Sequence, residues 1–303
     1  MVLSIVIVSW NTRDVLEVCL RSVLNSLQDL LDYEITVVDN ASVDGSAEMV
    51  REKFASVNLI ANAENVGYVR ANNQAVVVSR GKYILLLNSD TKMIDSGALQ
   101  VIDYMDNNSN TAIVTGRMLY EDGSFQPPYR RFPGLFGSIA RNTFRRIISL
   151  NTPFLKRFRY EELDPEEMHD VDWATGAYLY IRRDFLKQDA LFDEAIFMYY
   201  EDTLLCRRAW NAGYKVTYLP IAPIIHYRGI SAKTVRPKTI LYSFQSSVVY
   251  FERVYGALIA RFYRRAVRAI WWLSSLLLGL VPVRRFREKA ELFRYLYIED
   301  KNS

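Results

Sequence analysis

The chain has 303 residues, half of them hydrophobic and 24% charged, a balance that supports a sizeable core and excludes a wholly disordered or fibrous protein. The net charge of +4 is unevenly distributed: residues 124–160 hold eight basic and no acidic residues, and residues 253–294 hold ten basic and two acidic ones, which leaves 20 basic and 32 acidic residues elsewhere. We therefore expect an acidic body that carries two basic segments. The only two cysteines, Cys19 and Cys206, exclude a disulfide framework and a cysteine-based zinc site, and they favour a reducing cytoplasm.

The first third of the chain alternates predicted strands with predicted helices. The predicted strands cover residues 3–10, 35–39, 57–60 and 83–87, and the predicted helices cover residues 15–27, 47–54 and 70–79. Residues 1–10 lack the basic stretch and the small-residue cleavage site of a secretory signal, so we expect a core strand in a chain that is not exported. The alternation predicts a parallel sheet covered by helices.

Regular elements continue beyond residue 100. We predict strands over residues 112–115, 177–181, 215–219 and 224–226, and helices over residues 101–105 and 203–212. Residues 124–160 contain Pro127, Pro128 and Pro133 and all eight arginines and lysines counted above, and we expect a long loop or a helical flap there. The globular body should therefore span residues 1–230, with a helical tail over residues 231–303.

The tail contains an uncharged stretch, residues 269–283. As a helix it would reach about 22 Å, which is short of the ~30 Å hydrocarbon layer of a membrane. Arginines precede and follow the stretch: Arg261, Arg264, Arg265, Arg268, Arg284, Arg285 and Arg287. Together with neighbouring tryptophan and leucine residues, they favour an interfacial helix on an anionic membrane surface over a nucleic-acid partner. Pairing with a second copy of the chain, a homo-oligomer, is the competing interpretation.

Polar residues follow three of the predicted strands. They are Ser9 and Asn11, Asp39 and Asn40, and Asn88 and Asp90. Because ligands bind at the carboxyl ends of parallel strands, we expect these side chains to meet in one crevice. The glycine-rich loops of dinucleotide and P-loop sites are absent from the sequence. A carboxylate at Asp39 can instead accept from a base N–H or a ribose hydroxyl, and one at Asp90 can hold Mg²⁺ or Mn²⁺ against a diphosphate, although both residues also suit ordinary caps and turns.

Six segments, in order, resemble the motifs of family 2 glycosyltransferases in their rhamnosyltransferase-like branch. They read SIVIVSWNTRDVLEVCLRS, EITVVDNASVDGSAEMV, NAENVGYVRANNQA, GKYILLLNSDT, DWATGAYLYIRRDF and FDEAIFMYYEDTLLCRRAWNAGYKVTYLP. The resemblance covers most of residues 3–226. It implies a GT-A fold, the Rossmann-like α/β fold of nucleotide-diphospho-sugar transferases, with a mixed, mostly parallel sheet flanked by helices in residues 1–230.

The resemblance also implies roles for individual residues. The nucleotide is assigned to Ser9, Asn11, Asp39, Asn40, Asn65, Gly67, Arg70 and Asn88, the metal to Asp90 and His226, and the donor and acceptor sugars to Trp173, Thr175, Gly176 and Glu201. Asp202 is implied as the general base that takes the acceptor's proton. The Asn88-Ser89-Asp90 sequence departs from the family's commoner Asp-x-Asp, so we expect Asp90 to be the stronger metal ligand.

Simpler structural interpretations of four of these residues stay open at this point. Gly67 can serve a turn, Asp202 can cap a helix, His226 can be a packed strand-end residue and Trp173 a core residue. Only the surrounding motifs favour functional roles.

The leading prediction is an inverting glycosyltransferase that uses Mg²⁺ or Mn²⁺ and a dTDP- or UDP-sugar, with rhamnose suggested by the branch. Its expected acceptor is a lipid-linked or cell-surface glycan at the cytoplasmic face of the cell membrane. One alternative is a sugar nucleotidyltransferase, although the first strand lacks the glycine-rich loop that such enzymes use. Another is a catalytically silent, membrane-associated glycan-binding module, for which Asn88 in place of an acid is the best support.

Overall fold

The computed structural model describes residues 1–27, 32–142, 160, 162–186, 190–227, 236–281 and 284–302. The chain divides into two units. The sheet unit comprises residues 1–132, 156–197 and 201–233, and the helical unit comprises residues 133–155, 198–200 and 234–303.

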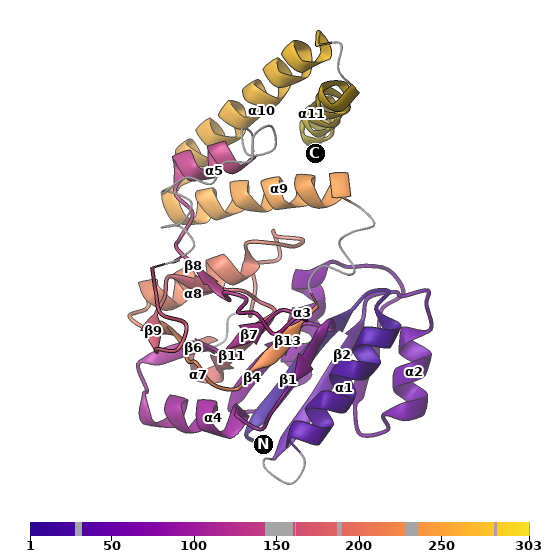
Figure 1. Cartoon of the computed structure of the whole chain (residues 1–303), viewed down its shortest axis with the longest axis vertical. Coiled ribbons are helices and arrows are strands. Elements are labelled where there is room, and N and C mark those ends of the chain that lie inside the picture. The colour runs from indigo at the N-terminus through magenta and orange to yellow at the C-terminus, as the bar shows by residue number, and fades with distance from the viewer. Residues whose placement is uncertain are drawn as a thin grey trace. The chain divides into compact units, whose positions relative to one another are not determined.

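An eight-stranded sheet forms the centre of the sheet unit (Figure 1). Its strands, in spatial order, are β3 (Asn58–Ala61), β2 (Tyr33–Asp39), β1 (Leu3–Ser9), β4 (Tyr83–Leu87), β11 (Tyr178–Arg182), β6 (Thr111–Thr115), β12 (Lys215–Tyr218) and β9 (His169–Asp170). The four strands from β3 to β4 are parallel, β11 is antiparallel to both of its neighbours, β12 is parallel to β6, and β9 is antiparallel at the edge. The predicted mixed, mostly parallel sheet is confirmed.

Helices lie on both sides of this sheet (Figure 1). They are α1 (Arg13–Leu27), α2 (Ser46–Lys53), α3 (Tyr68–Val78), α4 (Ala98–Asn107), α7 (Arg183–Leu186) and α8 (Glu201–Asn211). Helix α1 buries Leu16, Cys19, Leu20 and Val23 at helical spacing, which forms one apolar face. Both cysteines are buried in helices as predicted, and burial raises the pKa of Cys19 to about 12.

Two small sheets complete the sheet unit. The first consists of β5 (Thr91–Met93), β13 (Ile224–His226) and β7 (Met118–Leu119), with β13 in the middle. The second pairs β8 (Tyr129–Arg130) with β10 (Trp173–Ala174). The first sheet matters for function because β5 begins directly after Asp90 and β13 ends at His226.

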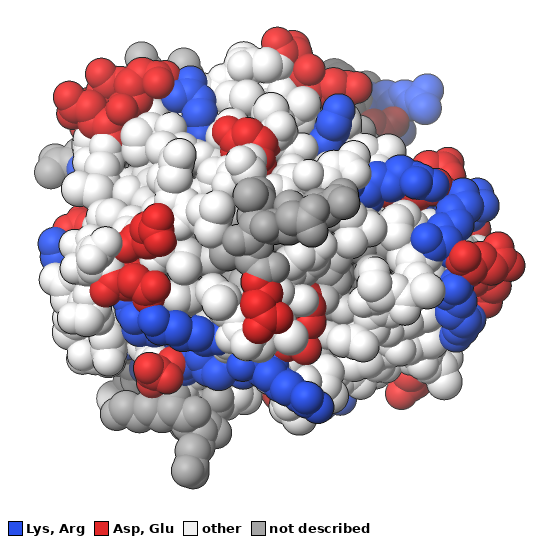
Figure 2. All heavy atoms as spheres, turned by 90° about the horizontal axis from the view of Figure 1, so that it is seen from below, with Lys and Arg blue, Asp and Glu red and all other residues white. Residues whose placement is uncertain are grey.

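The predicted basic flap, residues 124–160, is described only in part. Its described portion contains β8 and helix α5 (Leu135–Asn142), while residues 143–159 lie outside the described residues. On the face seen from below, acidic and basic side chains are interspersed, so the acidic excess predicted for the body does not gather into one patch there (Figure 2).

The helical unit contains α5, α9 (Arg236–Tyr255), α10 (Ala257–Gly279) and α11 (Arg284–Asn302). Its core is aromatic: Phe244 packs 4.6 Å from Trp271, measured between ring centroids. The Trp271 indole N–H donates to the backbone carbonyl of Asn142 at 2.9 Å. Trp271 is 0% exposed and Trp272 is 50% exposed, so Trp272, and not Trp271, can contact a surface outside the protein.

The predicted helix over residues 269–283 also differs from the structure. Helix α10 starts at Ala257 and ends at Gly279, so Arg261 to Arg268 belong to the same helix as the apolar stretch. Among the described residues, no helix is both long and apolar enough to cross a membrane.

Candidate active site

The carboxyl ends of β1, β2 and β4 meet, as predicted from the polar residues that follow them. The Ser9 hydroxyl lies 2.9 Å from the Thr12 hydroxyl, which donates to the Ser89 hydroxyl at 3.0 Å. The Asn40 backbone N–H donates to the carbonyl oxygen of Ser9 at 2.8 Å. Side-chain and backbone hydrogen bonds thus join three strand ends that are distant in sequence.

Asn11 links the loop after β1 to the loop after β2 through two hydrogen bonds. Its φ of 53° is in the left-handed region, which Asn tolerates better than most residues. The side-chain oxygen accepts the Val43 N–H at 2.8 Å, and the backbone N–H donates to the Ser42 hydroxyl at 2.9 Å. Asn11 therefore holds the loops that follow β1 and β2 together.

Asn40 fixes the loop that precedes α3. Its Nδ2 donates to Asn65 at 2.9 Å and to the Gly67 carbonyl at 3.3 Å, while its Oδ1 accepts from the Val66 N–H and from Asn62. All the main hydrogen-bonding positions of the Asn40 amide are therefore occupied within the protein. We assign Asn40 and Asn65 to holding this loop, and a nucleotide contact of their side chains stays a prediction.

Gly67 is required by its surroundings. It has a φ of 90°, and a Cβ at this position would come within 2.6 Å of the Phe197 ring. The turn interpretation is thus supported by conformation and by lack of space.

Asp39 has one carboxylate oxygen without a partner. Oδ2 accepts the Ser42 N–H at 3.0 Å, whereas the buried Oδ1 has no hydrogen-bond partner in the described part of the chain. A buried acceptor without a donor is destabilising, by about 1–3 kcal/mol. An unpaired buried oxygen at a strand end is therefore suited to a donor supplied by a ligand.

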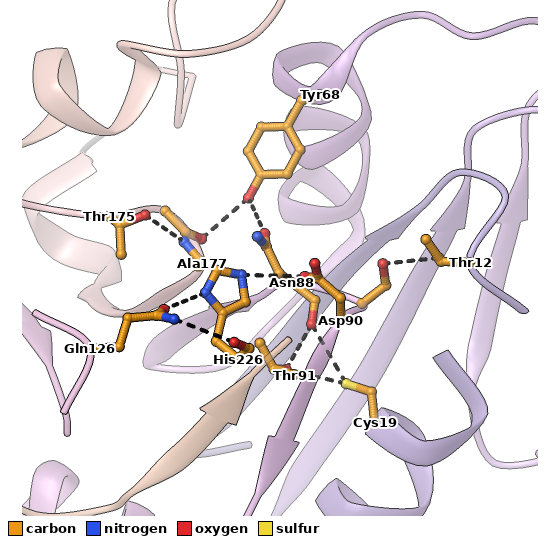
Figure 3. Close-up of polar contacts among 12 residues, drawn as sticks. Thr12, Cys19, Tyr68, Asn88, Asp90, Thr91, Gln126, Thr175, Ala177 and His226 are labelled. Carbon is orange, nitrogen blue, oxygen red and sulfur yellow. Dashed lines mark hydrogen bonds and ion pairs between the residues drawn. The ribbon is translucent and has the colours of Figure 1, made fainter. Parts of the chain in front are cut away.

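Tyr68 bridges the residues that follow β4 and those that precede β11 (Figure 3). Its hydroxyl is 3.2 Å from Asn88 Oδ1 and 3.2 Å from the carbonyl oxygen of Gly176. The Gly176 N–H donates to Asp202 Oδ2 at 3.0 Å. Burial and the charges of the surrounding carboxylates raise the pKa of Tyr68; those carboxylates are Glu201, Asp202 and Asp90. One phenol is therefore close to the predicted base and to the predicted metal ligand.

Asp90 and His226 lie side by side in the candidate site (Figure 3). The antiparallel pairing of β13 with β5 sets His226 opposite Thr91, the residue after Asp90. The His226 Nε2 lies 3.4 Å from Asp90 Oδ1, and both side chains are about 10% exposed. Within the described ranges, no group of three or more His, Cys, Asp or Glu side chains could hold a metal ion. A cation at this pair would therefore need further oxygen ligands from diphosphate and water, which is usual for Mg²⁺ bound beside a phosphate.

Glu201 and Asp202 occupy the first turn of α8. Asp202 Oδ1 accepts the Thr203 backbone N–H at 2.6 Å and the Thr203 hydroxyl at 3.1 Å. Burial raises the pKa of Asp202, and these bonds together with the Gly176 N–H oppose the rise. Burial and the neighbouring Asp202 charge raise the pKa of Glu201 well above its usual value, and Glu201 Oε2 has no partner among the described residues. Both carboxyl groups therefore have raised pKa values, and the three hydrogen bonds that Asp202 accepts favour its charged form.

Two predicted site residues, Arg70 and Trp173, have side chains that contact groups other than the residues around Tyr68 and Asp90, whereas Thr175 lies beside Ala177 in the site (Figure 3). The Arg70 side chain is exposed, and its Nε lies 3.5 Å from Glu194. The Trp173 indole N–H donates to the carbonyl oxygen of Arg131 at 2.9 Å, so the ring is half-buried against the basic segment. The Thr175 N–H donates to the Pro128 carbonyl at 2.8 Å. Contacts of these three residues with nucleotide or sugar stay predictions.

Tyr68 and Gln126 contact predicted site residues but were not themselves predicted from the sequence. The sequence contains a signal for Tyr68, because this residue lies inside the NAENVGYVRANNQA segment at the start of a helix. Gln126 lies in an irregular stretch without periodicity, and only the three-dimensional contact with His226 identifies it.

The sequence profile of glycosyl transferase family 2 matches residues 4–188, and the chain belongs to this family. An N-acetylglucosaminyl-diphospho-decaprenol L-rhamnosyltransferase of Mycobacterium tuberculosis is 26% identical over 244 residues, covering 76% of this chain and 77% of that protein. The rhamnosyltransferase WbbL of Escherichia coli is 27% identical over 262 residues, covering 82% of this chain and 92% of that protein. The predicted rhamnosyltransferase-like branch and glycosyltransferase activity are confirmed.

Solved structures show the same fold. GalNAc-T7, crystallised with UDP, GalNAc and Mn²⁺, matches with a TM-score of 0.62 at 17% identity, over all of this chain but only 57% of that chain. The mannosyltransferase PcManGT from Pyrobaculum calidifontis, in complex with GDP-Man and Mn²⁺, matches with a TM-score of 0.56 at 14% identity, over 99% of this chain and 87% of that one. The predicted GT-A-like α/β fold is therefore confirmed.

Proposed function

We propose that this protein transfers a sugar, with rhamnose as the first candidate, from a dTDP- or UDP-linked donor to a hydroxyl group of a lipid-linked or cell-surface glycan, with inversion at the anomeric carbon. The observation that carries the proposal is the position of Tyr68. Its hydroxyl donates to Asn88, two residues before Asp90, and to the carbonyl oxygen of Gly176, whose N–H donates to Asp202. The charges of Asp202 and Asp90 both raise the pKa of this hydroxyl. A base and a cation ligand that both lie near this hydroxyl can act on opposite ends of a single displacement.

In this reaction the ionised Asp202 accepts the proton of the acceptor hydroxyl while that oxygen forms a bond to the anomeric carbon. The bond between the anomeric carbon and the diphosphate oxygen breaks, and the nucleoside diphosphate leaves with the electron pair. A protonated Glu201 would donate a hydrogen bond to a sugar hydroxyl through Oε2, the buried carboxyl oxygen that has no partner within the described residues.

The side chains around Asp90 suit a divalent cation. A carboxylate and an imidazole nitrogen are ligands that Mn²⁺ accepts, and diphosphate oxygens can complete the coordination. A divalent cation bound by Asp90 and His226 would stabilise the negative charge that develops on the departing diphosphate. Both solved structures of the same fold, GalNAc-T7 and PcManGT, contain Mn²⁺, which supports a divalent cation here.

A donor panel tests the function. The purified protein should release nucleoside diphosphate from dTDP-rhamnose or a UDP-sugar when an N-acetylglucosaminyl-diphospho-polyprenol acceptor and Mn²⁺ or Mg²⁺ are present, and a chelator should abolish the release. The acceptor is chosen because it is named for the mycobacterial relative. Release of pyrophosphate would support a nucleotidyltransferase instead, and nucleotide binding without any transfer across the panel would support a silent glycan-binding module.

Replacement of Asp39 tests the nucleotide contact. We expect Asp39→Ala to weaken dTDP or UDP binding about 10–100-fold, because a hydrogen bond to a charged acceptor contributes roughly 1.5–3 kcal/mol. Calorimetric titration without metal measures this affinity. The matched control Asp44→Ala alters a carboxylate in the same loop region that is already bonded to Ser46 and Arg13. Equal affinities of native protein and Asp39→Ala would remove Asp39 from the nucleotide site.

We also propose that the helical unit binds an anionic membrane surface. Helix α10 buries Ala260, Tyr263, Val267 and Trp271 at helical spacing, which leaves another side of the helix outside the core. Large apolar side chains on that exposed side are Leu258, Phe262, Trp272, Leu273, Leu276 and Leu280. Exposed Arg261 and Arg265 accompany them, an arrangement typical of interfacial helices.

Not all arginines of α10 are equally available to lipid. Arg264 makes two hydrogen bonds of 3.0 Å to the fully buried Asp300 carboxylate, and Arg268 lies 3.7 Å from it. Arg261 and Arg265 line a solvent-accessible hollow of about 320 Å³, which Arg264, Arg268 and Asp300 also line. They are therefore the residues to replace when membrane binding is tested.

We expect the double variant Arg261→Gln, Arg265→Gln to bind phosphatidylglycerol vesicles roughly 30-fold more weakly, because each basic residue near an anionic surface contributes about 1 kcal/mol. Vesicle sedimentation measures the change, and Arg51→Gln with Arg80→Gln, two exposed arginines of the sheet unit, is the control of equal charge. Unchanged vesicle binding would reject the membrane proposal. Loss of a dimer in light scattering, without any vesicle effect, would favour the homo-oligomer.

A further inference from the structure

Gln126 lies directly beside His226 in the candidate cation site (Figure 3). Its backbone N–H donates to the carbonyl oxygen of Met118 at 2.9 Å, and Met118 belongs to β7. Strand β7 is parallel to β13, the strand that ends at His226. The three-stranded sheet therefore holds Gln126 in a buried position next to the imidazole ring.

The Gln126 side chain meets His226 at two points. Its Oε1 is 2.7 Å from Nδ1 of the ring, and its Nε2 donates to the backbone carbonyl oxygen of His226 at 3.4 Å. The backbone carbonyl can only accept, so the amide NH₂ must face it and the amide oxygen must face the ring. Since that oxygen also only accepts, Nδ1 carries the hydrogen.

A hydrogen on Nδ1 has a consequence at the opposite side of the ring. In a neutral imidazole the other nitrogen, Nε2, then keeps its lone pair. Nε2 is the atom that lies 3.4 Å from Asp90 Oδ1. A lone pair and a carboxylate oxygen therefore face each other, which is an arrangement that a cation between them would stabilise.

We propose that Gln126 is a positioning residue that holds His226 in the tautomer able to bind a divalent cation beside Asp90. The inference rests on the proposed function, because it needs a cation at this pair. Without an acceptor at Nδ1, the ring can adopt the Nε2–H tautomer and donate to Asp90. That hydrogen bond would occupy both ligands at once and compete with the cation.

The tautomer can be measured without any metal. The protein has only two histidines, and the Nε2 of His169 lies 2.7 Å from the carbonyl oxygen of Asp164, which requires an Nε2–H. With ¹⁵N-labelled histidine at about pH 8, where ordinary histidines are neutral, NMR should detect one ring protonated on Nδ1 and one on Nε2. The variant His169→Gln should remove only the second set. An Nε2–H on His226 in the native protein overturns the proposal.

Cation binding gives the second test. Manganese titration of the full-length protein with dTDP or UDP, followed by the electron paramagnetic resonance of free Mn²⁺, should show about ten-fold weaker Mn²⁺ binding for Gln126→Leu. Gln126→Glu keeps an acceptor for the Nδ1–H and should retain near-native affinity. Gln100→Leu, an exposed position on α4, is the control. Binding of the nucleotide alone should not change in any of the variants.

The outcomes separate this inference from the proposed function. If native protein and Gln126→Leu bind Mn²⁺ equally, Gln126 has no positioning role while the cation site stands. Equal losses in Gln126→Leu and Gln126→Glu would indicate a packing role only and likewise overturn the inference. If the native protein binds no Mn²⁺ beside its nucleotide, both the cation site and the role of Gln126 are rejected. Should Gln126→Leu fail to fold, the tautomer in the native protein decides the question.

Discussion

Asp202→Asn is expected to lower the rate of sugar transfer by about 10²–10⁴-fold while leaving nucleotide affinity nearly unchanged. A positioned general base contributes an effect of this size, and an amide cannot take the acceptor's proton. The rate of nucleoside diphosphate release at saturating donor and acceptor measures the loss. Because the amide NH₂ must face a former donor, either the Gly176 N–H or Thr203, we also expect thermal unfolding a few degrees lower.

The matched control for this variant is Asp184→Asn, which alters an exposed aspartate on α7 and should retain native turnover. If Asp202→Asn also retained native turnover, Asp202 would not be the base, whatever its effect on stability.

The pH profile gives independent evidence on the same group. Burial raises the pKa of Asp202, and a base is active only when ionised. Raising the pKa of a required base moves the acid limb of the profile to higher pH, so kcat/KM should fall on acidification at a pH above the ordinary aspartate range. A surviving acid limb in the residual activity of Asp202→Asn would assign that limb to another group.

The sequence pattern predicted the centre of the fold well, because buried parallel strands are continuous apolar runs. Leu3 to Ser9 and Tyr83 to Leu87 are such runs, and the polar residues that follow them come together at one edge of the sheet, as predicted. The insertion of antiparallel β11 between β4 and β6 has no local signal, since strand order depends on pairing across long sequence separations.

The contact of Asp90 with His226 is the clearest example of information that local pattern does not contain. It depends on β13 pairing with β5, two three-residue strands that are far apart in the sequence. Only the family resemblance connected the two residues. Similarly, the sequence could not distinguish Trp271 from Trp272, because an apolar helix does not reveal which of its sides is covered by the other helices.

Replacement of Asp90 is expected to have the second large effect. Asp90→Asn exchanges an anionic ligand for a neutral amide at the same position, and Mn²⁺ affinity in the presence of dTDP or UDP should fall by at least about ten-fold. Transfer should slow by about 10²–10³-fold, since charge stabilisation of a leaving group commonly has this magnitude. Measuring the rate as a function of Mn²⁺ concentration distinguishes weak binding, which added Mn²⁺ restores, from a lost contribution to the reaction itself.

The control for Asp90→Asn is Asp103→Asn, an exposed aspartate on α4 that should show the native dependence on Mn²⁺. The buried position of Asp90 beside His226 makes a further distinction possible. If Asp90 acts through the cation, Asp90→Asn and His226→Gln should each raise the Mn²⁺ concentration needed for half-maximal rate, and the double variant should raise it by less than the product of the two effects, because both residues hold one ion. A half-maximal Mn²⁺ concentration in Asp90→Asn equal to that of the native protein would mean that the cation binds elsewhere, and the proposed arrangement of base and cation around one sugar would be wrong.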